Sequence, residues 1–273
     1  MQEDWQEKIQ DSRSRTDSRG GDYGNSPISR ETFISLQMSI LQKLAFNQSG
    51  TIMNRPASED YDDIVRVMKE ASHQNTIFDR IECTIPNMAG WCSVEKAKTM
   101  AMLVMAMKPK VCVEIGVFAG RSTIPVAMAL KENGGGKLIA IDAWSAMASI
   151  ENETKQNREW WGKQVDYEAI YKAFLNSIEL AGVSYYVSAF KLKSDSFEPP
   201  VRIDFLHIDG SHTIQAVKDV ERFACKVPVH GIVVMDDLDW DGGGVLKAVE
   251  KLKEMGFQEL FKLGTGAVYQ RIK

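Results

Sequence analysis

Three aspartates follow two apolar stretches of the chain. Asp209 comes directly after the run Val201–Ile208, and Asp236 and Asp237 come directly after Ile232–Met235. We expect both runs to be neighbouring parallel strands, whose carboxyl ends bring the three carboxylates together. Like charges this close repel each other unless a cation compensates them, and Mg²⁺ prefers oxygen ligands. The pattern predicts a divalent-metal site; aspartates that only cap the next helices are the structural alternative.

A histidine lies beside these carboxylates in the sequence. His212 is three residues past Asp209, in the segment Asp-Gly-Ser-His, so its ring can face the same cleft. An imidazole titrates near neutral pH and can take a proton from a hydroxyl group. We predict that His212 is a general base, with a structural histidine bonded to a backbone carbonyl as the alternative. His207 lies inside the expected strand and is interpreted as a structural group.

A glycine turn follows the apolar run Val111–Ile115. Gly116 and Gly120 flank three residues, and the hydroxyl residues at positions 122 and 123 are expected to cap the helix that follows. A strand, a glycine turn and a helix form the crevice where open α/β sheets bind nucleotide-like ligands. A dinucleotide fingerprint has its second glycine where this chain has Phe118. A pyrophosphate is therefore disfavoured, and a nucleoside without phosphates is favoured.

Two acidic residues accompany this turn. The carboxylate of Glu114, just before the first glycine, suits a ligand that carries an ammonium or sulfonium group. Asp142 ends the next expected strand, Lys137–Ile141, and is 28 residues past Glu114 (142 minus 114). Doubly wound nucleotide folds place an acidic residue here, where it accepts hydrogen bonds from the ribose hydroxyls. We favour this role for Asp142 over the alternative, a strand-end aspartate that caps a turn.

In combination, these motifs resemble a known family. Glu-Ile-Gly-x-x-x-Gly-x-Ser at 114–122, Ile-Asp at 141–142 and His-Ile-Asp-Gly-Ser-His at 207–212 resemble the class I S-adenosylmethionine-dependent methyltransferases. They are most similar to the metal-dependent O-methyltransferases, a branch that includes enzymes acting on sugars and other small molecules. The resemblance covers residues 91–273. It implies S-adenosylmethionine and Mg²⁺ as cofactors and a small molecule with a hydroxyl group as the substrate.

The resemblance also implies which residues form the site. In this branch an aspartate after the fourth strand and an acidic pair after the fifth hold the ion, which corresponds to Asp209, Asp236 and Asp237. A histidine in the same Asp-Gly-Ser-His context is the proposed base of some sugar methyltransferases, which matches His212. In this family, residues just after the third strand contact the adenine. The third strand is expected at 184–189, and Ser188, at its end, is the candidate. The predicted cofactor-binding residues are Glu114, Gly116, Phe118, Gly120, Ser122, Asp142, Trp144, Ser188 and Asp209.

The order of the expected elements predicts an α/β fold with a doubly wound, mostly parallel sheet of seven strands. The last two strands, 257–263 and 267–272, are joined by Gly-Thr-Gly and are expected to form an antiparallel hairpin. Residues 93–273 are predicted to be the methyltransferase domain. Residues 28–92 are predicted to be a helical N-terminal cap, with helices at 29–47 and 58–71, and residues 1–27 a mobile polar tail. The polar connection 143–164 is expected to be a lid.

The bulk composition restricts partners and location. A formal net charge of −4 over 273 residues gives no reason to expect nucleic acid as a partner. No apolar run reaches the length that spans a bilayer, and the charged first residues do not resemble a signal sequence. We therefore expect a cytoplasmic protein that does not bind membranes. A homo-oligomer is possible.

Three other interpretations remain open from the sequence. A metal-independent methyltransferase that acts on nitrogen or on a carboxylate would use the same fold, with the acidic residues in a structural role. A nicotinamide-dependent oxidoreductase is disfavoured by Phe118 and by the terminal hairpin. A non-catalytic binding or scaffold protein is disfavoured by the acidic residues together with His212.

Overall fold

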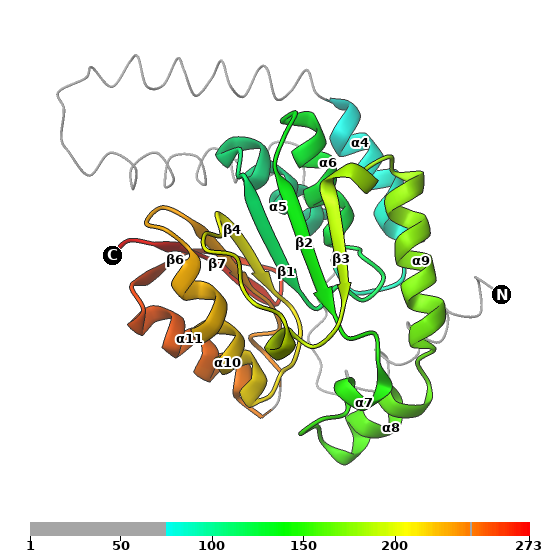
Figure 1. The fold of residues 1–273 in the computed structure, drawn as a ribbon, viewed down its shortest axis with the longest axis vertical. Coiled ribbons are helices and arrows are strands. Elements are labelled where there is room, and N and C mark those ends of the chain that lie inside the picture. The colour runs from blue at the N-terminus through cyan, green and yellow to red at the C-terminus, as the bar shows by residue number, and fades with distance from the viewer. Residues whose placement is uncertain (1–74, 241) are drawn as a thin grey trace.

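The computed structural model describes residues 75–240 and 242–273 (Figure 1). The predicted tail at 1–27 and the helices predicted at 29–47 and 58–71 lie outside the described residues. Of the predicted cap region, the structure describes the part from Asn75 onward. This part contains helix α4 (Asn75–Thr84) and the 3₁₀ turn η1 (Ile85–Asn87).

Seven strands form a single sheet, as the sequence predicts. Their order is β3-β2-β1-β4-β5-β7-β6; β1 to β5 run parallel, and β7 runs antiparallel to β5 and β6. The chain changes direction across the sheet between β1 and β4, and open α/β sheets bind ligands outside the carboxyl ends at such a point. The strands are β1 (Val111–Ile115), β2 (Lys137–Asp142), β3 (Val187–Lys191), β4 (Phe205–Ile208), β5 (Ile232–Met235), β6 (Phe257–Leu263) and β7 (Gly266–Arg271).

Helices cover both faces of the sheet (Figure 1). Buried residues of α5, α6 and α9, among them Met100, Ile124 and Phe174, form one apolar cluster. Buried residues of α10 and α11, among them Val220 and Leu252, form a second. The helices are α5 (Val94–Met107), α6 (Thr123–Glu132), α7 (Ala146–Ser149), α8 (Lys155–Lys163), α9 (Tyr167–Leu180), α10 (Ile214–Phe223) and α11 (Gly244–Glu254), with 3₁₀ turns η2 (Ser184–Tyr186), η3 (Ser194–Ser196) and η4 (Ala224–Lys226).

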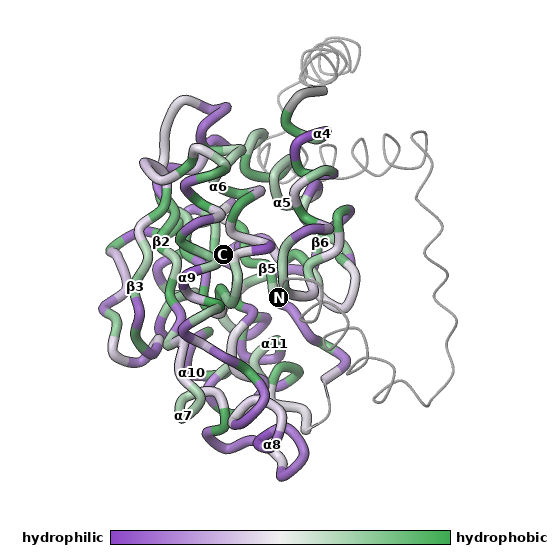
Figure 2. Tube along the Cα trace, turned by 90° about the vertical axis from the view of Figure 1, so that its right-hand side faces the viewer, coloured by the Kyte–Doolittle hydropathy of each residue, from purple (hydrophilic) through white to green (hydrophobic). Residues whose placement is uncertain are grey.

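The hydropathy of the chain follows this layering. Figure 2 shows hydrophobic residues concentrated in the strands and in α5 and α6, whereas α8 at the end of the molecule is mostly hydrophilic. The parallel strands β4 and β5, near the centre of the sheet, are buried at every residue. No helix within the described residues combines the length and the apolar character needed to cross a bilayer.

Several expected boundaries are wrong. The fourth strand begins at Phe205 rather than Val201, because Val201 is 94% exposed and has no apolar neighbour to pack against. The connection 143–164, predicted to be a lid, contains α7 and α8. Helix α10 begins at Ile214, and its N-cap is Thr213, whose hydroxyl accepts a hydrogen bond from Gln215 N at 3.3 Å.

Candidate active site

Asp142 at the end of β2 shapes the glycine turn. Its Oδ2 accepts hydrogen bonds from the backbone N–H groups of Val117 and Phe118, both at 2.9 Å, and its Oδ1 accepts one from Trp144 N at 2.7 Å. Burial raises the pKa of Asp142, and these three donors oppose that effect. A carboxylate has about four lone-pair positions. Backbone N–H groups occupy three of these positions, so one remains for a ribose hydroxyl. The hydrogen bond from Asp142 to the ribose stays a prediction.

Glu114 lies beneath the turn rather than in it. Its buried carboxylate accepts hydrogen bonds from the hydroxyls of Ser122 and Thr123, each at 2.5 Å, and from His207 Nδ1 at 2.9 Å. The expected cap of α6 is therefore wrong: Ser122 stands at the N-cap position, but its hydroxyl points at Glu114. As placed, Glu114 and Ser122 support the turn from below and do not face a ligand's charged group.

The two glycines of the turn make close approaches to other elements. A Cβ atom at Gly116, where φ is +85°, would lie 2.1 Å from the carbonyl oxygen of Asp209. A Cβ atom at Gly120, where φ is +83°, would lie 2.5 Å from Cδ2 of Phe174. Only a residue without a side chain fits at either position. The turn is thereby held directly against the end of β4, where the acidic residues begin.

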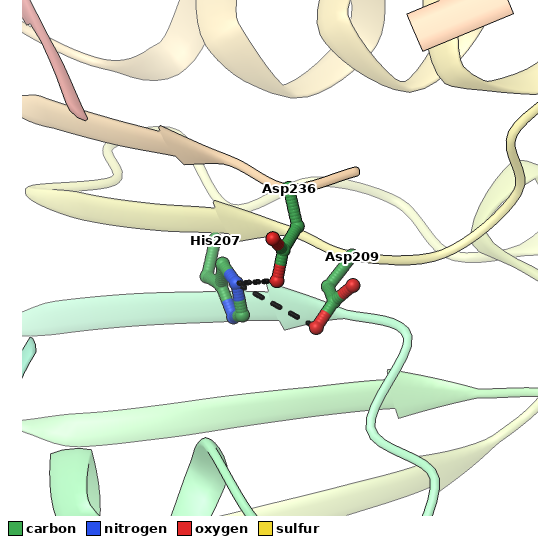
Figure 3. Close-up of side chains that lie close together, drawn as sticks. All are labelled: His207, Asp209 and Asp236. Atoms are coloured by element: carbon green, nitrogen blue, oxygen red, sulfur yellow. Dashed lines mark ion pairs between the residues drawn. The ribbon is translucent and has the colours of Figure 1, made fainter. Parts of the chain in front are cut away.

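Asp209 and Asp236 converge at the ends of β4 and β5, and the ring of His207 lies close to both carboxylates (Figure 3). The three ligand atoms lie within 4.8 Å of one another. His207 Nε2 is 3.9 Å from Oδ2 of each aspartate, is buried and has no hydrogen-bond partner. Burial raises the pKa of Asp209, which the charges of Lys96 and His207 oppose. We call His207, Asp209 and Asp236 the acidic cluster.

Helix α5 brings a lysine into the acidic cluster. Ser93 caps this helix, as predicted, and accepts a hydrogen bond from Lys96 N at 3.1 Å. The Lys96 side chain is 7% exposed; its Nζ forms an ion pair with Oδ2 of Asp236 and lies 3.9 Å from Oδ2 of Asp209. The other oxygen of Asp236 accepts hydrogen bonds from Asp237 N at 3.0 Å and from the Thr265 hydroxyl at 3.1 Å. Both oxygens of Asp236 are thus engaged.

Asp237 orients His212 instead of joining the acidic cluster. Its Oδ2 lies 2.8 Å from His212 Nε2, and the other ring nitrogen, Nδ1, lies 3.9 Å from Oε1 of Glu153. The ring of Trp240 stacks on the imidazole with 3.9 Å between centroids. Burial raises the pKa of Asp237, but the hydrogen bond with His212 opposes this effect, and the pKa of Asp237 lies below its usual value.

An open groove of about 630 Å³ lies at the carboxyl ends of β2 and β3. It is lined by residues of α7 and its flanking loops, by Arg158, and by Leu192 and Lys193. The third strand runs to Lys191 rather than ending at Ala189, because Ser184–Tyr186 forms a 3₁₀ turn and the strand starts three residues later. Ser188 is therefore inside the strand, and Leu192 and Lys193 occupy the place expected for it.

Aromatic rings cover the glycine turn. Trp91 packs on Phe118 with 5.2 Å between centroids and on Trp160 and Trp161 with 5.8 and 5.7 Å. Both of these tryptophans belong to α8, so the predicted lid segment does reach the turn. Trp144 lies on the other side: it is buried, and its indole N–H donates to the carbonyl of Phe118 at 2.7 Å. As placed, Trp144 supports the turn rather than facing the groove.

Sequence reasoning missed Lys96, the inward-facing nitrogen of His207, and Glu153. One feature of the sequence could have indicated the role of Lys96. Lys96 is the third residue of a helix whose N-cap is Ser93, and the positive end of a helix dipole disfavours a cation there. A lysine at such a position indicates a nearby carboxylate. Glu153 lies in a polar segment with no motif, so no pattern could have connected it with His212.

Comparison with known proteins agrees with this geometry. The pattern of a family described as a methyltransferase domain matches residues 113–238, which run from β1 to the residues just after β5. Over these residues, the chain is similar to methyltransferase domains. Over 154 residues, the chain is 29% identical to a putative caffeoyl-CoA O-methyltransferase from Arabidopsis thaliana. The match covers 55% of each chain, so the chain spans about half the length of this relative.

Solved structures share the fold of the domain. The O-methyltransferase NovP superposes with a TM-score of 0.55 at 16% identity, over 68% of this chain and 84% of that one. An S-adenosylhomocysteine-bound methyltransferase from Podospora anserina, PaMTH1, superposes with a TM-score of 0.50 at 14% identity, over 82% and 99% of the two chains. Identities this low establish the fold alone.

The predicted Mg²⁺ site does not fit the residues as they are arranged. Mg²⁺ requires several free oxygen ligands in near-octahedral geometry. Here both oxygens of Asp236 are bonded, the carboxylate of Asp237 is bonded to His212, and the ammonium of Lys96 already lies on the acidic cluster. The bare nitrogen of His207 is the one feature that suits a metal ion, and it prefers softer ions than Mg²⁺.

Proposed function

We propose that this protein transfers a methyl group from S-adenosylmethionine to a hydroxyl group of a small molecule. The methyltransferase domain and the O-methyltransferases among its relatives support the reaction class. The observation that carries the proposal is the pair formed by His212 and Asp237. It places an oriented imidazole at the ends of β4 and β5, in the part of the sheet where a class I domain presents its acceptor.

The glycine turn and the groove beside it would hold S-adenosylmethionine. The closed turn, with Phe118 in place of a second glycine, suits a ligand without a pyrophosphate. The nucleoside part would lie in the groove at the ends of β2 and β3, with Asp142 at its edge. When bound, S-adenosylmethionine supplies an electrophilic methyl group on a positively charged sulfur.

The residues around His212 determine which of its nitrogens can act. The carboxylate of Asp237 only accepts hydrogen bonds, so Nε2 donates to it and Nδ1 carries the lone pair. This Nδ1 would take the proton of the acceptor hydroxyl, and Glu153, 3.9 Å away, would stabilise the imidazolium. Most of the acceleration would come from orientation and fixed charges, because no covalent intermediate is needed.

Other predictions from the sequence stay predictions. The aromatic rings of Trp91, Trp160 and Trp161 suit an acceptor with an apolar or aromatic part, because such rings bury large apolar areas. Mg²⁺ dependence was expected from the acidic residues, and the arrangement of Asp236 and Asp237 does not support it. Cytoplasmic location is an expectation from the sequence alone, and the sequence leaves the oligomeric state open.

Calorimetric titration of the full chain with S-adenosylhomocysteine tests the proposed cofactor. We expect saturable binding, and a matched titration with NAD⁺ should give no heat of binding. Transfer of a labelled methyl group from S-adenosylmethionine to a panel of alcohols and phenols, with amines and carboxylic acids of the same skeletons, then tests the acceptor. Binding of NAD⁺ in place of the nucleoside, or transfer to the amines or acids alone, would overturn the proposal.

A further inference from the structure

The acidic cluster contains its own cation. Lys96 reaches from the first turn of α5 across to the ends of β4 and β5, and its ammonium forms an ion pair with Asp236. The same atom lies 3.9 Å from Oδ2 of Asp209. The side chain is almost fully buried, so water contributes little to solvating this charge. The carboxylates are therefore the groups that stabilise the ammonium, and the ammonium is what allows them to lie together.

Hydrogen bonds fix this arrangement from the other side. Asp237 N and the Thr265 hydroxyl hold the second oxygen of Asp236, so its carboxylate cannot turn toward a new ligand without breaking bonds. On α5, the Ser93 cap fixes the backbone of Lys96. A divalent ion bound at the same oxygens would stand next to the buried ammonium, and the two cations would repel each other.

We propose that Lys96 supplies the positive charge of the acceptor site, in the place where a divalent ion was expected, so that the enzyme needs no metal. This inference rests on the proposed function, because it concerns the charge balance of the same site. Lys96 acts as a positioning residue: it holds Asp209 and Asp236 together at the ends of β4 and β5. Asp209, the more exposed of these two carboxylates, is the one that faces the acceptor.

The bare nitrogen of His207 makes the proposal testable without measuring methyl transfer. Nδ1 of His207 donates to Glu114, and Nε2, the other ring nitrogen, has no hydrogen-bond partner and lies 3.9 Å from both aspartates. One imidazole nitrogen and two carboxylates are ligands that suit Mn²⁺. Removal of the Lys96 charge would leave these three groups without a cation, and the cluster would then take up a metal ion.

The experiment measures Mn²⁺ binding to the full chain. The electron paramagnetic resonance signal of free Mn²⁺ reports how much of the ion remains unbound. We expect no specific binding to the wild-type protein at millimolar Mn²⁺. We expect Lys96→Met, which keeps the length of the side chain and removes its charge, to bind one Mn²⁺ at least 100-fold more tightly. The matched control is Lys98→Met, which removes a charge from the same helix where Lys98 pairs with Glu82 at the surface. This control should bind no Mn²⁺.

Two Mn²⁺-binding results would overturn the proposal. One is wild-type binding of Mn²⁺ that Asp236→Asn abolishes, and the other is a folded Lys96→Met protein that binds no Mn²⁺. Wild-type methyl transfer that survives EDTA supports the proposal, and transfer that EDTA abolishes and Mg²⁺ restores overturns it. The wild-type measurements decide the matter even if Lys96→Met does not fold. A protein that fails to bind S-adenosylhomocysteine would disprove the proposed function, whereas the Mn²⁺ results concern Lys96 alone.

Discussion

His207 Nδ1 lies 2.9 Å from Oε1 of Glu114, and the two residues are direct partners on the adjacent strands β4 and β1. This single contact connects the support of the glycine turn with the acidic cluster, because Glu114 also holds Ser122 and Thr123. The proposed cofactor side and the proposed acceptor side of the site therefore share one buried hydrogen-bond network. Such networks are costly to leave half satisfied.

Replacing Glu114 should destabilise the whole domain. Glu114→Ala removes the acceptor for three buried donors, and loss of one partner of a buried pair typically costs about 3–5 kcal/mol in free energy of unfolding. Urea unfolding measures this. The control is Glu82→Ala, which removes an exposed partner of Lys98 and should cost less than about 1 kcal/mol. Equal effects of the two substitutions would contradict the role of Glu114.

Replacing His212 should lower activity without lowering cofactor affinity. We expect His212→Asn to reduce kcat/KM by roughly 10²- to 10⁴-fold, the usual contribution of a general base. Asp237→Asn should also reduce it, because an amide can donate to Nε2 and so stabilise the wrong tautomer. Labelled methyl transfer measures the rate, and titration with S-adenosylhomocysteine measures the affinity.

The control for His212 is His230→Asn, which changes an exposed histidine in the turn before β5. Asparagine tolerates the positive φ of 70° at this position, so the fold is kept. This variant should keep wild-type activity. A His212→Asn protein with wild-type turnover would remove His212 from the mechanism.

Gly116 should not tolerate even a methyl group. In Gly116→Ala the added Cβ would meet the carbonyl oxygen of Asp209 at 2.1 Å, and φ is +85°. Overpacking at such a site costs about 1–3 kcal/mol, and we expect weaker binding of S-adenosylhomocysteine because the turn must shift. Gly135→Ala is the matched control, since nothing lies within 4 Å of its added Cβ. Its stability should stay within about 0.5 kcal/mol of the wild type.

The parts of the fold that the sequence predicted are those with strong local patterns. The glycine turn, the buried strands, the Ser93 cap and the terminal hairpin each depend on residues that are close together in the chain. The acidic residues at the ends of adjacent strands also followed, because parallel strands align their carboxyl ends. Strand limits such as 187–191 were less predictable, since a 3₁₀ turn and a strand can contain the same residue types.

The partners of the predicted site residues could not be predicted. Packing between α5, β4 and β5 determines which oxygen of Asp236 pairs with Lys96. The same packing turns the carboxylate of Asp237 toward His212. These residues are up to 140 positions apart (236 minus 96). Charge balance did indicate that a cation must be present. It could not show whether that cation was a metal ion or a lysine.

A final prediction concerns Asp219 on α10, away from the site. Its buried carboxylate accepts hydrogen bonds from the Ser194 hydroxyl at 2.6 Å and from Gln215 Nε2 at 3.0 Å. Burial raises its pKa from 3.8 to about 6, and the two donors only partly oppose this effect. The folded state therefore binds a proton more tightly than the unfolded state. Its contribution to stability is complete below pH 3.8 and is lost as the pH rises through about 6.

Asp219→Asn should remove this pH dependence, because its amide oxygen accepts the same two hydrogen bonds and does not ionise. Relative to the variant, the wild type should lose about 3 kcal/mol of unfolding free energy between pH 3.5 and pH 7, from a shift of about two pKa units. Urea unfolding of both proteins across this range measures the difference, with Asp79→Asn at an exposed position as the control. A difference that stays constant with pH would show that Asp219 ionises normally, and that its hydrogen bonds rather than its burial govern the charge.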